Sequence, residues 1–296
     1  MKLHRGLTLI ELLVVIGILG ILSAVLIVAL SGSTDSARAA NCLTNMRNIA
    51  MGCQSYGMSH GTYPFAGSFE QYSAQGTRSE TVFQQGWIGF DDGNKYTSCY
   101  SKGASDDALH CITNGTIWEA VAKNRSTYQC PSHVRTAQEQ AGVNVWWSYA
   151  MNAYFLWQSR SSPYSSGRSG ISYGGLSRAD RILLLSELQF TTIAGFADSI
   201  NFNTAATDQT DPILQYENSD GASSAETIGF NHMMGKQYCA HVCFADGHTE
   251  KILFPRKNAA AGNLRTMTRW LCTGGKDNDG KYGDVILKGS KYELLK

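Results

Sequence analysis

The sequence lacks a strong excess of either charge. Its 296 residues include 25 Lys and Arg against 24 Asp and Glu, a formal net charge of +1, and charged residues make up only 17% of the chain. A nearly neutral chain has no general electrostatic attraction for nucleic acid, so we predict no nucleic-acid partner. Hydrophobic residues reach 43%, which indicates an ordered globular body with a sizeable core.

Cysteine, by contrast, is plentiful. Eight cysteines are more than a reducing compartment usually tolerates without a metal or a catalytic role, and this number favours export. Cys99 and Cys111 lie in a glycine- and serine-rich segment and are the best candidates for a disulfide. Cys42 and Cys53, about 16 Å apart along one predicted helix, cannot bond each other. The sequence leaves the remaining connectivity open.

Charge and proline are almost absent from residues 7–30. Glu11 is the only charged residue in this run. At ~1.5 Å per helical residue the run spans about 36 Å, enough to cross a hydrocarbon core of roughly 30 Å. Because Lys2, His4 and Arg5 precede it, the basic end should stay in the cytoplasm. We predict a single-pass membrane protein whose C-terminal head lies in the periplasm or at the cell exterior.

The residues at the start of this run resemble the prepilin cleavage and methylation motif of type IV pilins and type II secretion pseudopilins. Gly6 is followed by Leu7, Thr8, Leu9, Ile10 and Glu11 and then by the apolar run. The resemblance implies cleavage between Gly6 and Leu7 by prepilin peptidase, N-methylation of Leu7, and assembly with other subunits at the inner membrane. A carboxylate within a membrane costs free energy, so Glu11 is expected to pair with the new amine and set the register between neighbouring helices.

Further segments resemble a pilin-like subfamily, namely residues 42–50, 128–132, 148–152 and 244–248. The last of these, Phe-Ala-Asp-Gly-His, is similar to the subfamily's terminal motif, in which a histidine lies about nine residues before Asp246 and Gly247. His232 is the nearest equivalent, with thirteen residues between it and Asp246, which implies a small insertion. The simplest role for His232 is to support the hairpin that also contains His248.

After residue 30 the pattern predicts an amphipathic helix and then a strand-rich head. Residues 31–36 are of helix-capping types, so the helix is expected to kink or restart there. An apolar stripe with spacings of three and four then continues to about His60. Residues 117–123 are a short helical candidate. Strands are predicted at residues 144–149, 181–185, 241–245 and 249–254, with a two-residue hairpin turn at Asp246-Gly247.

These predictions define an α+β fold, in which a long N-terminal helix carries a head dominated by antiparallel strands. The expected divisions are a leader at 1–6, a transmembrane helix at 7–30, its amphipathic continuation at 31–60 and an exported head at 61–296. The predicted function is that of a pilin-like or pseudopilin-like structural subunit of a type IV pilus or a type II secretion pseudopilus. We do not expect an enzyme, because no convincing catalytic constellation is present.

Two metal hypotheses are weaker. No cofactor is firmly predicted. Asp277, Asp279 and Asp284 cluster in a glycine-bearing segment, and calcium favours such oxygen ligands, so calcium is the stronger of the two metal candidates. Cys239, His241 and Cys243 alternate along one predicted strand, with His248 across the hairpin. Zinc accepts such ligands, but ligands spaced in this way along a single strand diverge.

The alternative function is that of a membrane-tethered binding module for carbohydrate or another extracellular ligand. It depends on an aromatic stretch formed by Trp146, Trp147, Tyr149, Tyr154 and Trp157. Aromatic side chains of this kind can form a sugar-binding platform, although packing in a core is their commoner use.

Overall fold

A computed structural model of the chain confirms the predicted α+β class. It describes residues 8–71, 82–90, 99–155, 171–176, 178–188, 212–214, 228–234, 237–253, 267–268 and 271–272. The elements in chain order are α1 (Leu9–His60), β1 (Phe69–Gln71), β2 (Val82–Gln84), β3 (Tyr100–Ser101), α2 (Asp106–Thr113), η1 (Arg125–Tyr128), α3 (Pro131–Ala141), β4 (Asn144–Val145), β5 (Tyr149–Asn152), η2 (Ala153–Phe155), β6 (Leu183–Glu187), β7 (Ile213–Leu214), β8 (His232–Met234), β9 (Gln237–Phe244) and β10 (Thr249–Leu253).

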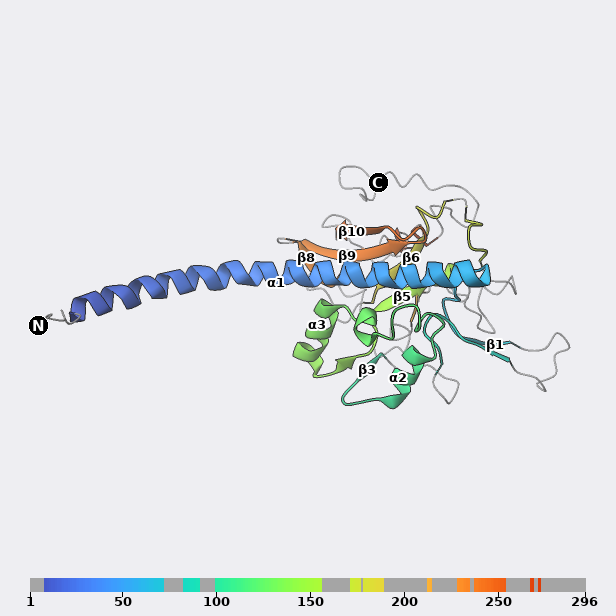
Figure 1. Cartoon of the computed structure of the whole chain (residues 1–296), viewed down its shortest axis with the longest axis horizontal. Coiled ribbons are helices and arrows are strands. Elements are labelled where there is room, and N and C mark those ends of the chain that lie inside the picture. Colours follow the sequence, from blue (N-terminus) through green and yellow to red (C-terminus); the bar gives the residue numbers. More distant parts are fainter. Residues whose placement is uncertain are drawn as a thin grey trace, which may run out of the picture.

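Helix α1 is continuous over 52 residues. Its N-terminal part projects away from the head, and its C-terminal part lies along the head (Figure 1). It ends at the predicted residue, His60, where Gly61 adopts the left-handed conformation with φ 76°. The helix does not restart at residues 31–36, because it continues through them. One polar side chain of this segment, Asp35, pairs with Arg38 along the helix surface at 2.7 Å instead of capping a new helix.

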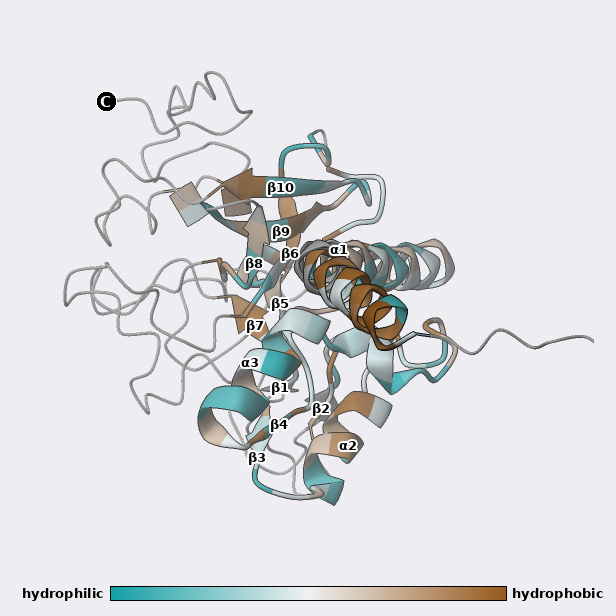
Figure 2. Ribbon diagram, turned by 90° about the vertical axis from the view of Figure 1, so that its left-hand side faces the viewer, coloured by the Kyte–Doolittle hydropathy of each residue, from teal (hydrophilic) through white to brown (hydrophobic). Residues whose placement is uncertain are grey.

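The two parts of α1 have different surroundings. In the N-terminal part the large apolar side chains are exposed, as for Leu9, Ile10, Leu12, Leu13, Val14, Val15, Ile16, Ile18, Leu19, Ile21, Leu22 and Val25. The hydropathy colouring, in a view nearly along the helix axis, shows that this end of α1 is strongly apolar (Figure 2). Over the described residues, no helix combines the length and apolarity that crossing a membrane requires. In the C-terminal part most of the predicted stripe is buried, at Ala39, Met46, Ile49, Ala50 and Cys53. Its remaining member, Leu43, is only half-buried, and the neighbouring Cys42 is buried in its place.

The central sheet has the strand order β10-β9-β6-β5-β7, and β8 also pairs with β9. All its pairings are antiparallel except the parallel pairing of β5 with β7. Helix α1 contacts β6, β8, β9 and β10 of this sheet as well as α3 and η1. The sheet therefore provides the cover that the apolar stripe of α1 requires.

Two helices of the head, α2 and α3, are absent from the sequence prediction, and the predicted helix at residues 117–123 is instead a run of turns. That run ends in positive φ at Ala122 (57°) and Lys123 (55°), which a regular helix excludes. Helix α2 also explains why the predicted Cys99–Cys111 disulfide is wrong for this structure. Cys111 is not in a loop but on the buried face of α2, and no disulfide joins any of the eight cysteines, all of which are buried and described.

The hairpin between β9 and β10 is confirmed, but its turn differs from the predicted one. A two-residue turn at Asp246-Gly247 of type I′ would need positive φ at both residues. Only Gly247 has it, at 90°, and Asp246 does not. The Gly247 N–H donates to the Phe244 carbonyl at 2.9 Å, and the Phe244 N–H donates to the His248 carbonyl at 2.9 Å. The connection is thus a three-residue turn with glycine in its left-handed position.

Gly247→Ala should lower the free energy of unfolding by about 1–2 kcal/mol, because a Cβ makes left-handed backbone unfavourable. The new Cβ would also lie 2.8 Å from Gln54 Nε2, which would have to move. Chemical unfolding of the detergent-solubilised protein measures the change. Gly103→Ala is the matched control, because Gly103 lacks positive φ and has no atom within 4 Å of a built Cβ. Equal effects of the two substitutions would contradict the assigned turn.

Candidate functional site

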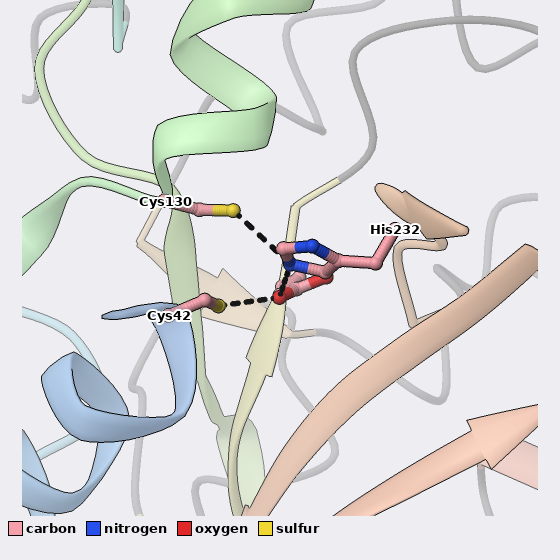
Figure 3. A group of neighbouring side chains, drawn as sticks. Cys42, Cys130 and His232 are labelled. Atoms are coloured by element: carbon pink, nitrogen blue, oxygen red, sulfur yellow. Dashed lines mark hydrogen bonds and ion pairs between the residues drawn. The ribbon is translucent and has the colours of Figure 1, made fainter. Parts of the chain in front are cut away.

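A buried carboxylate, Glu187, is the centre of a polar cluster inside the head. It is the last residue of β6, all five residues of which are buried, so the strand carries its carboxylate into the core. Cys42 of α1, Cys130 at the N-cap of α3 and His232 of β8 converge on it (Figure 3). Four separate segments of the chain therefore meet at this point.

The polar atoms of the cluster are close together. The Cys42 thiol donates to Glu187 Oε1 at 2.6 Å. His232 Nε2 lies 2.8 Å from the same oxygen and 3.3 Å from Cys130 Sγ. One ligand atom from each of these four residues lies within 4.8 Å of every other, so the group could hold a metal ion.

Charge pairing makes this arrangement tolerable in the core. Burial alone would raise the pKa of the Glu187 carboxyl, but the charge and hydrogen bond of His232, with those of His241, outweigh it and hold that pKa well below its usual range. Burial likewise opposes the charge on His232, but the Glu187 carboxylate beside it raises the pKa of His232 to about 11. Without a metal, the centre of the cluster is an imidazolium–carboxylate pair.

The two thiols have different pKa values. Burial is the main cause that raises the pKa of Cys42 well above its ordinary value, and Cys130 and Glu187 add to it. Burial acts in the same direction on Cys130, but the hydrogen bonds from Cys42 and His232 outweigh it and lower its pKa to about 7. Cys130 is therefore much more readily ionised than Cys42.

A second set of side chains orients the first. His241 Nδ1 lies 3.2 Å from Glu187 Oε1, and the Asn231 amide donates to Glu187 Oε2 at 3.4 Å. The Tyr149 hydroxyl donates to Cys42 Sγ at 3.4 Å. The other ring nitrogen of His232, Nδ1, lies 3.1 Å from Ser132 Oγ. Each member of the cluster except Cys130 is thus held by a partner outside it.

A cleft of about 300 Å³ leads from the surface to His232. It lies between α3 and the strands β8 and β9, and its lining includes Asp35, Ser132, Phe230, His232 and Tyr238. His232 itself is only 3% exposed. The cluster is therefore enclosed, but one edge of it is adjacent to solvent.

Helix α3 contributes another buried histidine, His133, whose Nε2 lies 2.8 Å from the Tyr100 hydroxyl. Burial is the main cause that lowers the pKa of His133 to about 4, and the charge of His232 adds to this effect although Glu187 opposes it. His133 is therefore neutral in the folded protein at pH 7, whereas an unfolded histidine titrates near 6.5.

Only part of this cluster coincides with the predicted site residues. His232 belongs to it, so its role is larger than support of the hairpin. Cys239, Cys243 and His248 are not in the metal-capable group, and His248 pairs instead with Asp246. His241 contacts the cluster through Glu187.

Sequence reasoning missed Glu187. Its clearest signal in the sequence is that it is a single carboxylate two residues after the apolar run Leu183-Leu184-Leu185. The weak calcium candidates Asp277, Asp279 and Asp284 lie outside the described residues.

The aromatic stretch does not form a sugar-binding platform. Trp147 and Tyr149 are fully buried, Trp146 is 5% exposed, and Tyr154 is partly buried against the core. Trp157 lies outside the described residues. The four described side chains pack in or against the core, which is the commoner use of aromatic residues.

The N-terminal motif forms a second candidate site at the start of α1. Thr8 and Glu11 make a capping box, in which the Glu11 N–H donates to Thr8 Oγ1 at 3.3 Å and the Thr8 N–H donates to Glu11 Oε2 at 2.8 Å. Gly6 and Leu7, the predicted cleavage residues, lie outside the described residues. Glu11, which is predicted to set the register between helices, thus also helps to cap the N-terminus of α1.

Comparison with known proteins agrees with this motif. A family model for the prokaryotic N-terminal methylation motif matches residues 1–27. No curated protein and no solved structure gave a significant match to the chain. The match supports a processed, pilin-like or pseudopilin-like protein of the membrane-anchored, exported kind.

Lowering the pH from 6.5 to 5 should destabilise the protein through His133. Its folded pKa is below its unfolded one, so the stability it contributes is present above pH 6.5 and is lost as the pH falls toward 4. We expect wild type to lose about 1.5 kcal/mol more than His133→Gln over this interval. Chemical unfolding followed by tryptophan fluorescence, with EDTA present to remove proton linkage from bound metal, measures the difference.

His60→Gln is the control for that experiment, because His60 is exposed at the end of α1. It should retain the acid sensitivity of wild type. The same acid sensitivity in His133→Gln and in wild type would contradict the assignment to His133.

Proposed function

We propose that the chain is a pilin-like or pseudopilin-like structural subunit, processed by prepilin peptidase and assembled with other subunits through its N-terminal helix. The observation that carries the proposal is the methylation motif at residues 1–27, most of which forms the start of one continuous helix, α1, that projects from the head. Its function is assembly and not turnover. The proposed filament is a type IV pilus or a type II secretion pseudopilus.

The division of α1 supports a helix that works in two environments. Its apolar N-terminal part has no cover from the head, as the exposure of Leu9, Val14 and Leu22 illustrates. Exposed apolar area of this size is unfavourable in water and indicates a membrane or partner helices as its surroundings. The proposed sequence of events is storage of the subunit in the inner membrane and then packing against neighbouring subunits.

The capping box gives Glu11 a physical role in this assembly. Cleavage after Gly6 would create a positively charged amine at Leu7, one residue before the N-cap Thr8. A cation at a helix N-terminus is opposed by the helix dipole, and a carboxylate in the first turn is favoured by it. Glu11 is therefore well placed to neutralise this amine, in its own subunit or in the next one.

Glu11→Gln separates the charge from the cap, because glutamine at this position also completes a capping box. The helix and the head should stay folded and cleavage should proceed. Incorporation into filaments should fall by at least about tenfold, because a charge-assisted contact becomes a neutral one. Co-expression with wild type in cells that contain the assembly machinery, followed by shearing or crosslinking, measures incorporation.

Thr8→Ala is the matched control for Glu11→Gln, since it removes a capping hydroxyl and keeps the charge. It should incorporate better than Glu11→Gln. Normal incorporation of Glu11→Gln would overturn the role of Glu11 in register.

Gly6→Leu tests processing separately. A bulky residue before the cleavage point should block prepilin peptidase and leave an uncut, larger protein in the membrane. Mass spectrometry of the N-terminus distinguishes this product from the mature form, which should begin at a methylated Leu7 in wild type. A mature N-terminus in the variant would contradict prepilin processing.

A further inference from the structure

The cluster around Glu187 contains more ligand chemistry than an ion pair needs. A single imidazolium–carboxylate pair requires only His232 and Glu187. Two cysteine sulfurs are held against the same pair, and Cys42 Sγ is 2.6 Å from the carboxylate oxygen that His232 also contacts.

The ligand types correspond to zinc. Zinc binds thiolate sulfur, imidazole nitrogen and carboxylate oxygen in a tetrahedron, with bonds of about 2.0–2.3 Å. The ligand atoms of such a tetrahedron lie roughly 3.2–3.8 Å apart. Here every pair of ligand atoms is within 4.8 Å, and three contacts among them measure 2.6, 2.8 and 3.3 Å. Movements of about 1 Å or less would bring these contacts to tetrahedral spacing.

We propose that Cys42, Cys130, Glu187 and His232 form a structural zinc site that fastens α1 to the head. All four positions of the tetrahedron come from protein, which is typical of a structural site; a catalytic zinc keeps a position for water. One ligand is on α1 and three are on the head, so the ion joins the two parts. This assignment is independent of the proposed assembly function.

The surroundings resemble the outer shell of a metal centre. A ligating histidine usually makes a hydrogen bond through its other ring nitrogen, which fixes the orientation of the ring. His232 Nδ1 does so with Ser132 Oγ at 3.1 Å. The ligating carboxylate is likewise held, through Asn231 on Oε2 and His241 on Oε1, and Tyr149 holds Cys42.

Loading the site with zinc exchanges protons for the metal ion. Metal ligation needs deprotonated thiols and a neutral imidazole, so binding zinc releases protons. A divalent cation would replace the proton of His232 as the counter-charge of Glu187. The cleft beside His232 provides the path by which the ion enters.

A disulfide between Cys42 and Cys130 is the competing use of the same sulfurs. It would consume both thiols, and neither sulfur could then serve as a metal ligand beside Glu187 and His232. The outcome is decided by whether an exported chain acquires zinc before oxidation. The test must therefore measure metal content and thiol content in the same sample.

The experiment uses the full chain, purified in detergent without chelator. Elemental analysis should find about one zinc per chain. After removal of the metal under reducing conditions, added Co²⁺ should give the intense visible bands of a tetrahedral site together with sulfur-to-cobalt charge-transfer absorption. Added Zn²⁺ should abolish these bands and raise the melting temperature by at least about 5 °C, because it binds only the folded state.

Variants identify the ligands. Cys42→Ser and Cys130→Ser should each weaken zinc binding by at least about 100-fold, since even loss of an outer-shell partner typically costs 10–100-fold. Cys53→Ser is the matched control, because Cys53 is an equally buried cysteine of α1 outside the cluster. It should retain the metal and the cobalt spectrum. The cobalt spectrum of wild type keeps the test decisive if a serine variant fails to fold.

Three results would overturn the proposal. One is wild-type protein with neither zinc nor tetrahedral cobalt bands after reduction. Another is equal zinc in wild type and in folded Cys42→Ser or Cys130→Ser protein, which would mean adventitious metal. The third is a Cys42–Cys130 disulfide in the freshly isolated chain, found by non-reducing mass spectrometry, together with no zinc recovery.

Discussion

The head depends on the neutralisation of one buried carboxylate. An isolated ionised group in a protein core costs several kcal/mol, and removing one partner of a buried pair typically costs 3–5 kcal/mol. Glu187 is fully buried and has its nearest cationic partner in His232, which comes from β8, a different segment of the chain. The fold therefore has to bring β6 and β8 together, because only then does His232 offset the free-energy cost of burying the ionised Glu187 carboxylate. That requirement ties several otherwise separate elements to one place.

The same cluster fixes how α1 lies on the head. The buried face of α1 is made largely of small side chains, such as Ala39, Cys42, Ala50 and Cys53. At Gly52 an added Cβ would lie 3.2 Å from Val121 Cγ1, so the helix approaches the head closely there. Small apolar side chains permit close approach of the helix. They specify its register on the head only weakly, because they differ little from one another in size and shape. The contact of Cys42 with Glu187 adds a polar and directional element to this interface.

The sequence predicted the frame of the molecule better than its site. The end of α1 at His60, the strands around β6, β9 and β10, and the hairpin containing Gly247 were all predictable, because periodicity and turn residues are local signals. The turn type was wrong, since the conformation of Asp246 depends on hydrogen bonds across the hairpin. Helix α3 was missed although Pro131 stands at its N1 position, a recognised helix-start signal.

The cluster could not be predicted from spacing. Cys42 and Glu187 are 145 residues apart in sequence, and Cys130 and His232 are 102 apart. Such pairings depend on tertiary structure, and local sequence patterns do not report on it. The predicted metal candidates along β9 fail for the converse reason, because neighbours in sequence on one strand point their ligand atoms along a line and not toward a common centre. The sequence does show that Glu187 is unusual, because it is a single carboxylate that closely follows an apolar run.

The two carboxylates that lie in apolar sequence, Glu11 and Glu187, occupy junctions of different kinds. Glu11 is at the free end of α1, is exposed, and is satisfied by the nearby Thr8. Because its partner is local, it can exchange that partner for a new amine without disturbing the head. Glu187 is held by residues from distant segments and cannot exchange them without unfolding the core. The charge that can change partners thus lies at the end of the helix that would meet other subunits, and the fixed charge lies inside the head, where Cys42 of α1 contacts it.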